Sequence, residues 1–470
     1  MKKIKKGLAL SLALAMGLSL CACGDKGGTT AEQPKDTAEA TKADTSADTQ
    51  EATDGADAPA AAMEKPGTDG EKIYVYGWNS EFVGYVTDEF LAKYPEYTDL
   101  IETVNLGVGG GSDEYKTAIE NAVSGNTDQY ASVFGMDDAL APYFMMSDYT
   151  ANYYDLGITD AMYANCYAYT KDYATFDGQL KGLTWQATPG CFCYRRDIAQ
   201  EVLGVSEPDQ VQEYVKDWAT FTDTASKMKE KGYFMVSGVD DLAYPYRDAV
   251  TSPWVTKDGD TETLNIDQAI KDYLEMTKVF YDNGYTDGTT QWADAWNANF
   301  DGPVFGYFGT TWFTFWNVTS LSKEHAAAGD WGMVAGPADY HWGGTYIAVG
   351  KDSPNPELAA FIAYTMCCDE DFMYEHLKND KDFVNNKNAV QRVIDEGGLK
   401  IPEFSDQDPL ETWAAQTDKI NLKYATEYDS TFYGYLADAV SAYDKDGDMD
   451  AALKVLKDRI SQSYSYIVIE

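Results

Sequence analysis

The chain has 470 residues, and its 77 Asp and Glu against 36 Lys and Arg give a formal net charge of −41 with histidine neutral. So large a negative charge excludes a nucleic-acid-binding protein that depends on neutralising phosphates. Hydrophobic residues make up 44% of the sequence and aromatic residues 14%, which excludes a wholly disordered chain. The length requires at least two lobes, and the 35 tyrosines suit uncharged, hydroxyl-rich ligands better than anions.

The N-terminus has the pattern of a bacterial export signal. Four lysines lie within residues 1–6, and the apolar stretch that follows to Leu20 is too short to span a bilayer. The next residues resemble a lipobox, Leu20-Cys21-Ala22-Cys23-Gly24. We expect a lipoprotein signal peptide over 1–22 and lipidation of Cys23, which would hold the mature protein at a membrane surface; the alternative is an ordinary cleaved signal.

Residues 23–71 differ in composition from the rest of the chain. They consist largely of Ala, Thr, Asp, Glu, Gly and Lys, with almost no large apolar side chain. Such a segment cannot bury enough apolar surface to offset the entropy of ordering. We therefore expect a disordered acidic tether over 23–71 and a fold that begins at Lys72.

Strands and helices are expected to alternate after this tether. The sequence predicts strands over 72–76, 100–106 and 130–134, and a further strand over 191–194. Between the first three, apolar residues recur at helical spacing, with Ser112 as the N-cap of the second helix: Phe82, Val86 and Phe90, then Tyr115, Ile119 and Val123.

The alternation predicts an α/β fold with a largely parallel sheet. Ligands of such sheets bind beyond the carboxyl ends of the strands. Trp78, Asn79, Met136 and Asp137 stand at these positions.

Two segments resemble binding loops but lack the residues that such loops need. Gly109-Gly110-Gly111 has no following Lys-Ser/Thr and precedes Asp113 and Glu114, whose charges would repel a phosphate. Within 444–450 the glycine stands at position four instead of six of an EF-hand loop, and position twelve lacks a glutamate. We expect a turn at each place, the second before a last helix with Leu453, Leu456 and Ile460 inward.

The cysteines and histidines form no recognisable metal or catalytic motif. The sequence has no CxxC pair and no HExxH helix. After processing at Cys23 an odd number of cysteines remains, which we expect to be mostly buried, with one disulfide left open: Cys166, Cys191, Cys193, Cys367 and Cys368. No orienting partner is recognisable for His325, His341 or His376, so we expect no cofactor, no metal and no catalytic residue.

A series of short motifs runs from about residue 72 to the end of the chain. They are Gly182-Leu183-Thr184-Trp185, Tyr194-Arg195-Arg196-Asp197, Ser252-Pro253-Trp254, Gly306-Tyr307-Phe308-Gly309 before Trp312, and the segments 331–337, 343–349 and 355–361. In this order they resemble the extracellular solute-binding lipoproteins of bacterial carbohydrate ABC transporters, family 1 type, which are similar to maltose-binding protein. The first two motifs depart from the family's Gly-Leu-Pro-Trp and Tyr-Asn-Lys-Asp segments.

This resemblance implies a two-lobed periplasmic-binding-protein-like fold, with a ligand cleft between lobes joined by hinge crossovers. Lobe 1 would comprise 72–189 and 332–369, and lobe 2 would comprise 190–331 and 370–470. The protein would be a receptor and not an enzyme, capturing a sugar or oligosaccharide by cleft closure and delivering it to ABC transporter permease subunits. It would act as a monomer on the extracytoplasmic face of the cell membrane, held there by its lipid anchor.

Aromatic and polar residues in loops or after extended segments are the candidate ligand contacts. A sugar presents C–H patches to aromatic rings and hydroxyl groups to planar polar partners. The aromatic candidates are Trp78, Trp185, Trp254, Trp296, Trp312, Trp342 and Tyr346, with Trp78, Trp185 and Trp312 favoured by their place in the resemblance. The hydrogen-bonding candidates are Asn79, Asp137, Gln186, Asp241 and Arg247. Core packing and plain surface exposure are the respective alternatives.

Two other functions stay open at this point. A secreted glycoside hydrolase would use two carboxylates and could also be lined with aromatic residues. A peptide-binding lipoprotein of the same shape is the third possibility.

Overall fold

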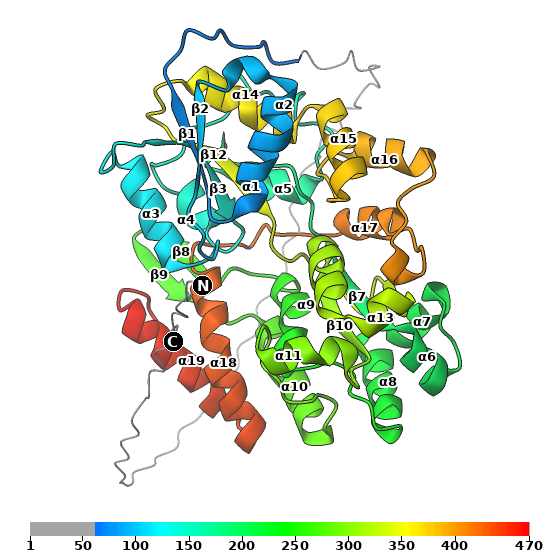
Figure 1. The fold of residues 1–470 in the computed structure, drawn as a ribbon. Helices are drawn as coiled ribbons and strands as arrows, with labels where there is room; N and C mark the ends of the chain where they lie inside the picture. Colours follow the sequence, from blue (N-terminus) through cyan, green and yellow to red (C-terminus); the bar gives the residue numbers. More distant parts are fainter. Residues whose placement is uncertain (1–61, 470) are drawn as a thin grey trace, which may run out of the picture. The chain divides into compact units, whose positions relative to one another are not determined.

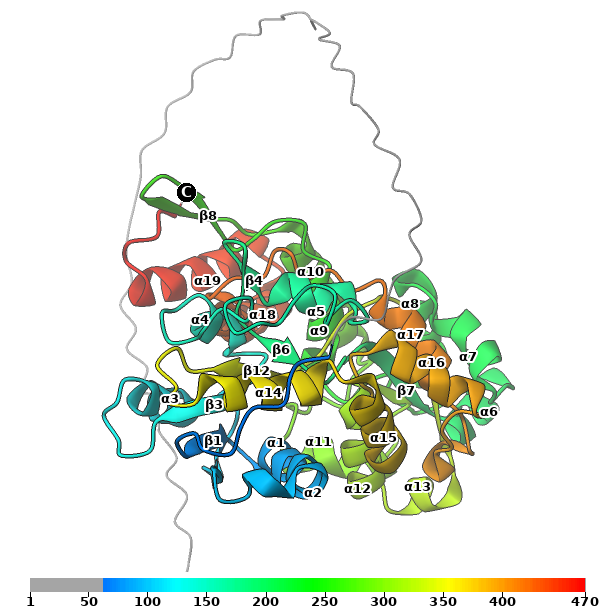
Figure 2. The ribbon, with the colours of Figure 1, turned by 90° about the horizontal axis from the view of Figure 1, so that it is seen from above.

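The structure is a computed structural model that describes residues 62–469 (Figures 1 and 2). The expected signal peptide, the lipidation site at Cys23 and the tether up to residue 61 lie outside the described residues. Met63 packs against the folded part, and the Tyr97 hydroxyl donates to the Pro66 carbonyl at 2.6 Å. Lys65 pairs with Glu96. The chain therefore joins the fold about nine residues earlier than the start at Lys72 that composition predicted.

The first lobe is built on a five-stranded sheet with the order β2-β1-β3-β12-β6. Its strands are β1 (Ile73–Gly77), β2 (Ile101–Asn105), β3 (Ala131–Asp137), β6 (Leu183–Thr184) and β12 (Thr345–Val349). β1 pairs in parallel with β2 and β3, as the alternation predicted, whereas β12 runs antiparallel to β3 and β6. The sheet is thus mixed, because β12 enters from the other lobe in the opposite direction.

Helices cover this sheet where the apolar spacing predicted them. The first runs through α1 (Ser80–Gly84), the π-helix η1 (Tyr85–Phe90) and α2 (Leu91–Lys93), and buries Phe82, Val86 and Phe90. The second is α3 (Asp113–Val123), whose Tyr115 amide donates to the Ser112 side chain at 3.1 Å. α14 (Pro356–Cys367) lies beside β12 in both views and is buried along nearly its whole length.

The second lobe is built on an antiparallel sheet with the order β10-β7-β11. Its strands are β7 (Gly190–Arg195), β10 (Gly306–Thr310) and β11 (Trp331–Val334). The strand expected over 191–194 is confirmed as β7. Around it lie α6 (Arg196–Leu203), α7 (Pro208–Val215), α8 (Trp218–Glu230), α9 (Ala243–Asp248), α10 (Gln268–Asn283), α11 (Asp294–Ala298), the π-helix η5 (Phe313–Val318), α13 (Glu324–Ala328) and the hairpin β8 (Val255–Asp258) with β9 (Thr261–Leu264).

The C-terminal part is helical. It contains α15 (Glu370–Asp380), α16 (Lys387–Asp395), α17 (Leu410–Thr417), α18 (Asp429–Asp446) and α19 (Met449–Ser463). α18 packs on α19 and on α10 of the second lobe (Figure 1). Gly447, with φ of 67°, ends α18, and Asp448 caps α19, so the segment once comparable to a calcium loop is a turn, as expected. Leu456 and Ile460 of α19 are buried.

Two of the expected lobe boundaries need correction. β11 pairs with β7, so the boundary expected at 332 falls inside a strand of the second lobe, and the chain crosses back only between β11 and β12. α15 packs on the first lobe, where Phe372 stacks on Tyr85 with ring centroids 5.5 Å apart. The boundary at 370 was therefore placed too early.

The remaining fold expectations concern cysteines and the membrane. Cys191, Cys193, Cys367 and Cys368 are buried, Cys166 is half-buried, and all five are free thiols, which confirms that they are mostly buried small side chains. Within residues 62–469 no helix combines the length and the apolar character that crossing a bilayer requires.

Candidate functional site

The main cavity has a volume of about 680 Å³ and is lined by residues of both lobes. The first lobe contributes Trp78 and Asp137, which follow or end β1 and β3, as expected for the carboxyl edge of parallel strands. The second lobe contributes Arg247 of α9, Trp312 after β10 and Tyr433 of α18. A ligand in this cavity would contact both lobes at once.

Five of the chain's 11 tryptophans line this cavity: Trp78, Trp292, Trp312, Trp316 and Trp342. Trp312 meets Trp342 edge to face with centroids 5.0 Å apart and donates from Nε1 to its carbonyl at 3.1 Å. Trp292 stacks on Trp312 at 6.3 Å. Trp292 and Trp316 are 49% and 51% exposed, which leaves large aromatic faces available to a ligand.

Two residues near the cavity, Trp292 and Gly110, have unusual backbone requirements. Trp292 has φ of 70°, a left-handed value that is costly for a bulky side chain and is found most often at functional sites. On the opposite side Gly110 permits close approach, since a Cβ there would lie 2.8 Å from Cε2 of Trp78 and 2.9 Å from Cβ of Asp137. The turn expected at residues 109–111 thus lies against the cavity wall.

Three carboxyl groups of the cavity have raised pKa values, and burial is the main cause for each. Burial raises the pKa of Glu81 to about 8, that of Asp429 to about 7 and that of Asp137 to about 6. Glu81 Oε1 also accepts a hydrogen bond from Gln186 Nε2 at 2.7 Å. At neutral pH Glu81 is therefore mostly protonated and can donate as well as accept hydrogen bonds.

His341, in the crossover between β11 and β12, links carboxylates of the two lobes. Its Nδ1 lies 2.7 Å from Asp248 Oδ2 at the end of α9, and its Nε2 lies 3.3 Å from Asp138 Oδ1 after β3. The backbone amide of His341 donates to the same Asp248 oxygen at 2.6 Å. Burial alone would lower the pKa of His341, but Asp248 and Asp138 outweigh it and raise the pKa well above 6.5. The imidazolium therefore neutralises charge where the lobes meet.

Arg247 is the other cation of the cavity. Its guanidinium carbon lies 4.5 Å from the ring centroid of Tyr244 and 4.8 Å from that of Tyr433. Its buried Nε has no hydrogen-bond partner, and within residues 62–469 no carboxylate forms an ion pair with it. Two aromatic faces hold this group at the wall of the main cavity.

Six of the expected contacts line the main cavity: Trp78, Asn79, Asp137, Gln186, Arg247 and Trp312. Trp342, from the wider aromatic set, lines it too. Their role as ligand contacts stays a prediction.

The other five candidates do not line the main cavity, and we correct their assignment as contacts there: Trp185, Asp241, Trp254, Trp296 and Tyr346. Trp296 is fully buried and donates from Nε1 to Asp241 Oδ1 at 2.8 Å, while Asp241 also accepts from the backbone of Ser237 and Gly238. Trp296 and Asp241 thus stabilise the loop around Ser237 and Gly238 from the interior of the second lobe.

The remaining three rings are buried in apolar packing and do not themselves line the main cavity. Trp254 packs edge-on against Phe432 at 5.7 Å, and Tyr346 packs against Tyr173 at 5.3 Å. Trp185 stacks on Phe82 with centroids 5.8 Å apart and lines a second cavity instead.

Sequence reasoning missed several residues of the cavity: Glu81, Asp138, Tyr173, Tyr244, Asp248, Trp292, Trp316, His341, Asp429 and Tyr433. Some carried a local signal, because Asp138 and Asp248 directly follow expected contacts and Trp316 stands four residues after Trp312. Asp429 and Tyr433 carried none, since α18 reaches the cavity only through tertiary packing.

A second cavity of about 750 Å³ shares four lining residues with the first: Asn79, Glu81, Trp312 and Trp316. It extends toward α15 and η1, where its wall includes Trp185, Glu89 and His376. The two cavities thus lie on either side of Glu81 and Trp312.

We predict that the stabilising effect of His341 depends on pH. Because its pKa is raised in the folded state, its contribution is fully present below about pH 6.5 and is lost as pH rises through the folded-state value. Replacing it in His341→Gln leaves Asp138 and Asp248 without their cation, which should cost about 3–5 kcal/mol at pH 6. Thermal unfolding of both proteins from pH 5.5 to 10 measures the difference, which should shrink with rising pH; a constant difference would contradict this role.

Comparisons with known proteins agree with this geometry. Residues 86–391 match the family model of the bacterial extracellular solute-binding proteins. A comparison with curated proteins finds no significant match.

Solved structures share the fold over nearly their whole length. An extracellular solute-binding protein of family 1 has a TM-score of 0.70 at 17% identity, covering 84% of this chain and 99% of that one. An ABC-transporter-associated binding protein from B. animalis subsp. lactis, in complex with beta-1,6-galactobiose, has a TM-score of 0.65 at 18% identity, with coverages of 86% and 100%. The galacto-N-biose/lacto-N-biose I-binding protein from Bifidobacterium longum, in complex with lacto-N-biose, has a TM-score of 0.65 at 14% identity and the same coverages. The match of the family model over more than half of the sequence shows that this chain belongs to the bacterial extracellular solute-binding proteins.

Proposed function

We propose that this protein captures an uncharged sugar or oligosaccharide in its main cavity and delivers it to the permease of an ABC transporter. The five tryptophans around a cavity of about 680 Å³ carry this proposal, because aromatic faces pack on the C–H patches of sugar rings. The disaccharides bound by the two bifidobacterial neighbours support it.

The charges of the cavity favour an uncharged ligand. Asp138 and Asp248 share the His341 cation, and burial keeps Glu81 largely protonated at neutral pH. The other lining groups include Arg247 and Asp137, which carry charges of opposite sign, and the neutral amide of Asn79. Such groups suit hydroxyls, whereas a strongly ionic ligand would need a counter-charge of one sign.

Binding takes place without turnover in this proposal. Asp138 and Asp248 are both held by His341, and Glu81 is held by Gln186, so these carboxyl groups already have partners. The protein acts as a monomer, and the ligand closes the lobes around itself as a population shift between open and closed states.

Purified protein tested against mono- and oligosaccharides should be stabilised by at least one sugar without releasing products from it. Thermal unfolding measures the stabilisation, and a reducing-end assay on the same mixtures measures hydrolysis. New reducing ends would instead indicate a glycoside hydrolase. Stabilisation by peptides alone would indicate a peptide receptor.

Replacing Trp312 should weaken sugar binding by about tenfold or more, because a ring face that stacks on the ligand contributes about 1.5 kcal/mol. Isothermal titration of Trp312→Ala with the identified sugar measures this. The matched control is Tyr281→Ala, since Tyr281 is 60% exposed on α10 and lies outside the lining of the cavity. Affinity should also change little between low and high salt; a steep salt dependence would mean a charged ligand.

We further propose that Cys23 carries the lipid anchor, on the lipobox-like sequence alone. In cells, Cys23→Ser should move the protein from the membrane fraction to the soluble fraction, whereas Cys21→Ser should leave it membrane-bound. Fractionation and immunoblotting measure the distribution. Equal membrane association of wild type and Cys23→Ser would refute the assignment.

A further inference from the structure

The wall of the second cavity that faces α15 carries a group of acidic residues with few cations. Glu89, Asp380 and Asp382 all contact a single histidine, His376. Within residues 62–469 no lysine or arginine forms an ion pair with any of the three. Even with His376 protonated, these four side chains would keep a net negative charge, which favours a further cation.

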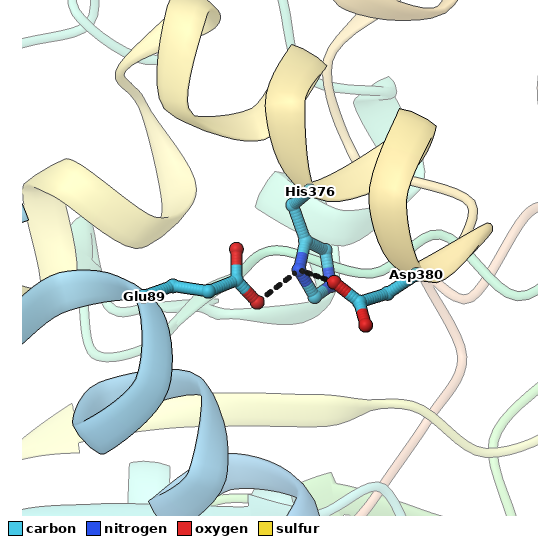
Figure 3. A group of neighbouring side chains, drawn as sticks. All are labelled: Glu89, His376 and Asp380. Atoms are coloured by element: carbon cyan, nitrogen blue, oxygen red, sulfur yellow. Dashed lines mark hydrogen bonds and ion pairs between the residues drawn. The ribbon is translucent and has the colours of Figure 1, made fainter. Parts of the chain in front are cut away.

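Figure 3 shows Glu89, His376 and Asp380 pointing toward one another from two helices. Glu89 comes from η1, whereas His376 and Asp380 stand four residues apart on one face of α15. His376 Nδ1 lies 2.8 Å from Glu89 Oε1 and 3.6 Å from Asp380 Oδ2, and the three donor atoms lie within 4.8 Å of one another. Ligand atoms around a tetrahedral zinc ion are about 3.3–3.5 Å apart, so small side-chain shifts would complete the geometry.

The second ring nitrogen of His376, Nε2, faces a carboxylate, as the second nitrogen of metal-binding histidines usually does. His376 Nε2 lies 3.4 Å from Asp382 Oδ2, an oxygen that also accepts from Trp185 Nε1 at 3.0 Å and Gln186 Nε2 at 2.9 Å. In the ion-free site Nδ1–H donates to Glu89; a bound ion would replace this proton, while Nε2–H would stay directed at Asp382. Such a carboxylate behind a histidine orients the ring and raises its basicity toward a metal.

A second observation at this place is independent of the acidic group. Among residues 62–469 the buried Tyr85 hydroxyl finds no hydrogen-bond partner, and Tyr85, which is 4% exposed, lines the same cavity. Its ring stacks on that of His376 with centroids only 3.9 Å apart. An oxygen ligand or water on a bound ion would give the Tyr85 hydroxyl a partner.

Another histidine cluster of the second lobe lacks these properties. Asp197, His325 and Asp330 are equally close together, but Arg195 Nη2 lies 2.6 Å from His325 Nε2 and pairs with Asp197 at 2.7 Å. The Arg195 guanidinium already supplies a positive charge to that cluster, so that cluster has less need of a metal ion than the group around His376.

We propose that Glu89, His376 and Asp380 form a binding site for a divalent transition-metal ion, with zinc as the best fit. One imidazole nitrogen and two carboxylate oxygens are ligands that zinc accepts, with a fourth position left for water. Because Asp382 is bonded to both His376 and Gln186, the ion would stiffen the wall that separates the two cavities.

The test is a calorimetric titration of the chelator-stripped full chain with zinc chloride alone. One zinc ion should bind per chain, and Asp380→Asn and Glu89→Gln should each weaken binding by about tenfold or more. Asp380 has a side chain that is 57% exposed, so its variant should fold. Asp88→Asn is the matched control, because it removes one charge from the same cavity outside the triad and should change affinity less than threefold.

Cobalt(II) supplies a second readout, since an imidazole ligand in a low-coordinate site gives visible absorption bands that should disappear in His376→Gln. The absence of zinc binding by the wild type would overturn the proposal. Equal binding by Asp380→Asn and Glu89→Gln would also overturn it, as would calcium binding as tight as that of zinc, because calcium prefers oxygen ligands alone.

Discussion

Carboxyl groups withdrawn from water where the two lobes meet have to be neutralised, protonated or hydrogen-bonded, and the binding cavity depends on how this is done. One histidine in a crossover, His341, holds a carboxylate of each lobe. Glu81 is instead kept largely protonated by burial and is bonded to Gln186. The charged groups that remain in the cavity lining are of both signs and include Arg247 and Asp137. Such a lining would suit the uncharged sugar that we propose as the ligand.

The aromatic residues divide into two populations with different roles. Trp185, Trp254 and Trp296 pack into the interior, where their large apolar area stabilises the lobes. Trp292 and Trp316 remain about half exposed on the cavity wall. Tryptophan thus serves both the interior of the lobes and the wall of the cavity, and position in the fold separates the two settings.

The sequence predicted the features that depend on local structure and missed those that depend on contacts between distant segments. The first lobe followed its apolar spacing closely, from the strand before Gly77 to the Ser112 cap, because periodicity reports local structure directly. The positions of Trp78 and Asp137 followed from the rule that ligands bind at strand ends. The antiparallel entry of β12 and the π-helical form of η1 did not, since both depend on packing between distant segments. Glu89 and His376 stand 287 residues apart, so no local motif could reveal their contact.

We expect the main cavity to take its ligand between the two lobes and to close on it. Small-angle scattering of the protein with and without a saturating concentration of the identified sugar tests this most directly. We predict a smaller radius of gyration in the presence of the sugar, because closure makes the liganded form more compact. An unchanged radius of gyration under conditions where calorimetry shows the sugar to be bound would contradict it.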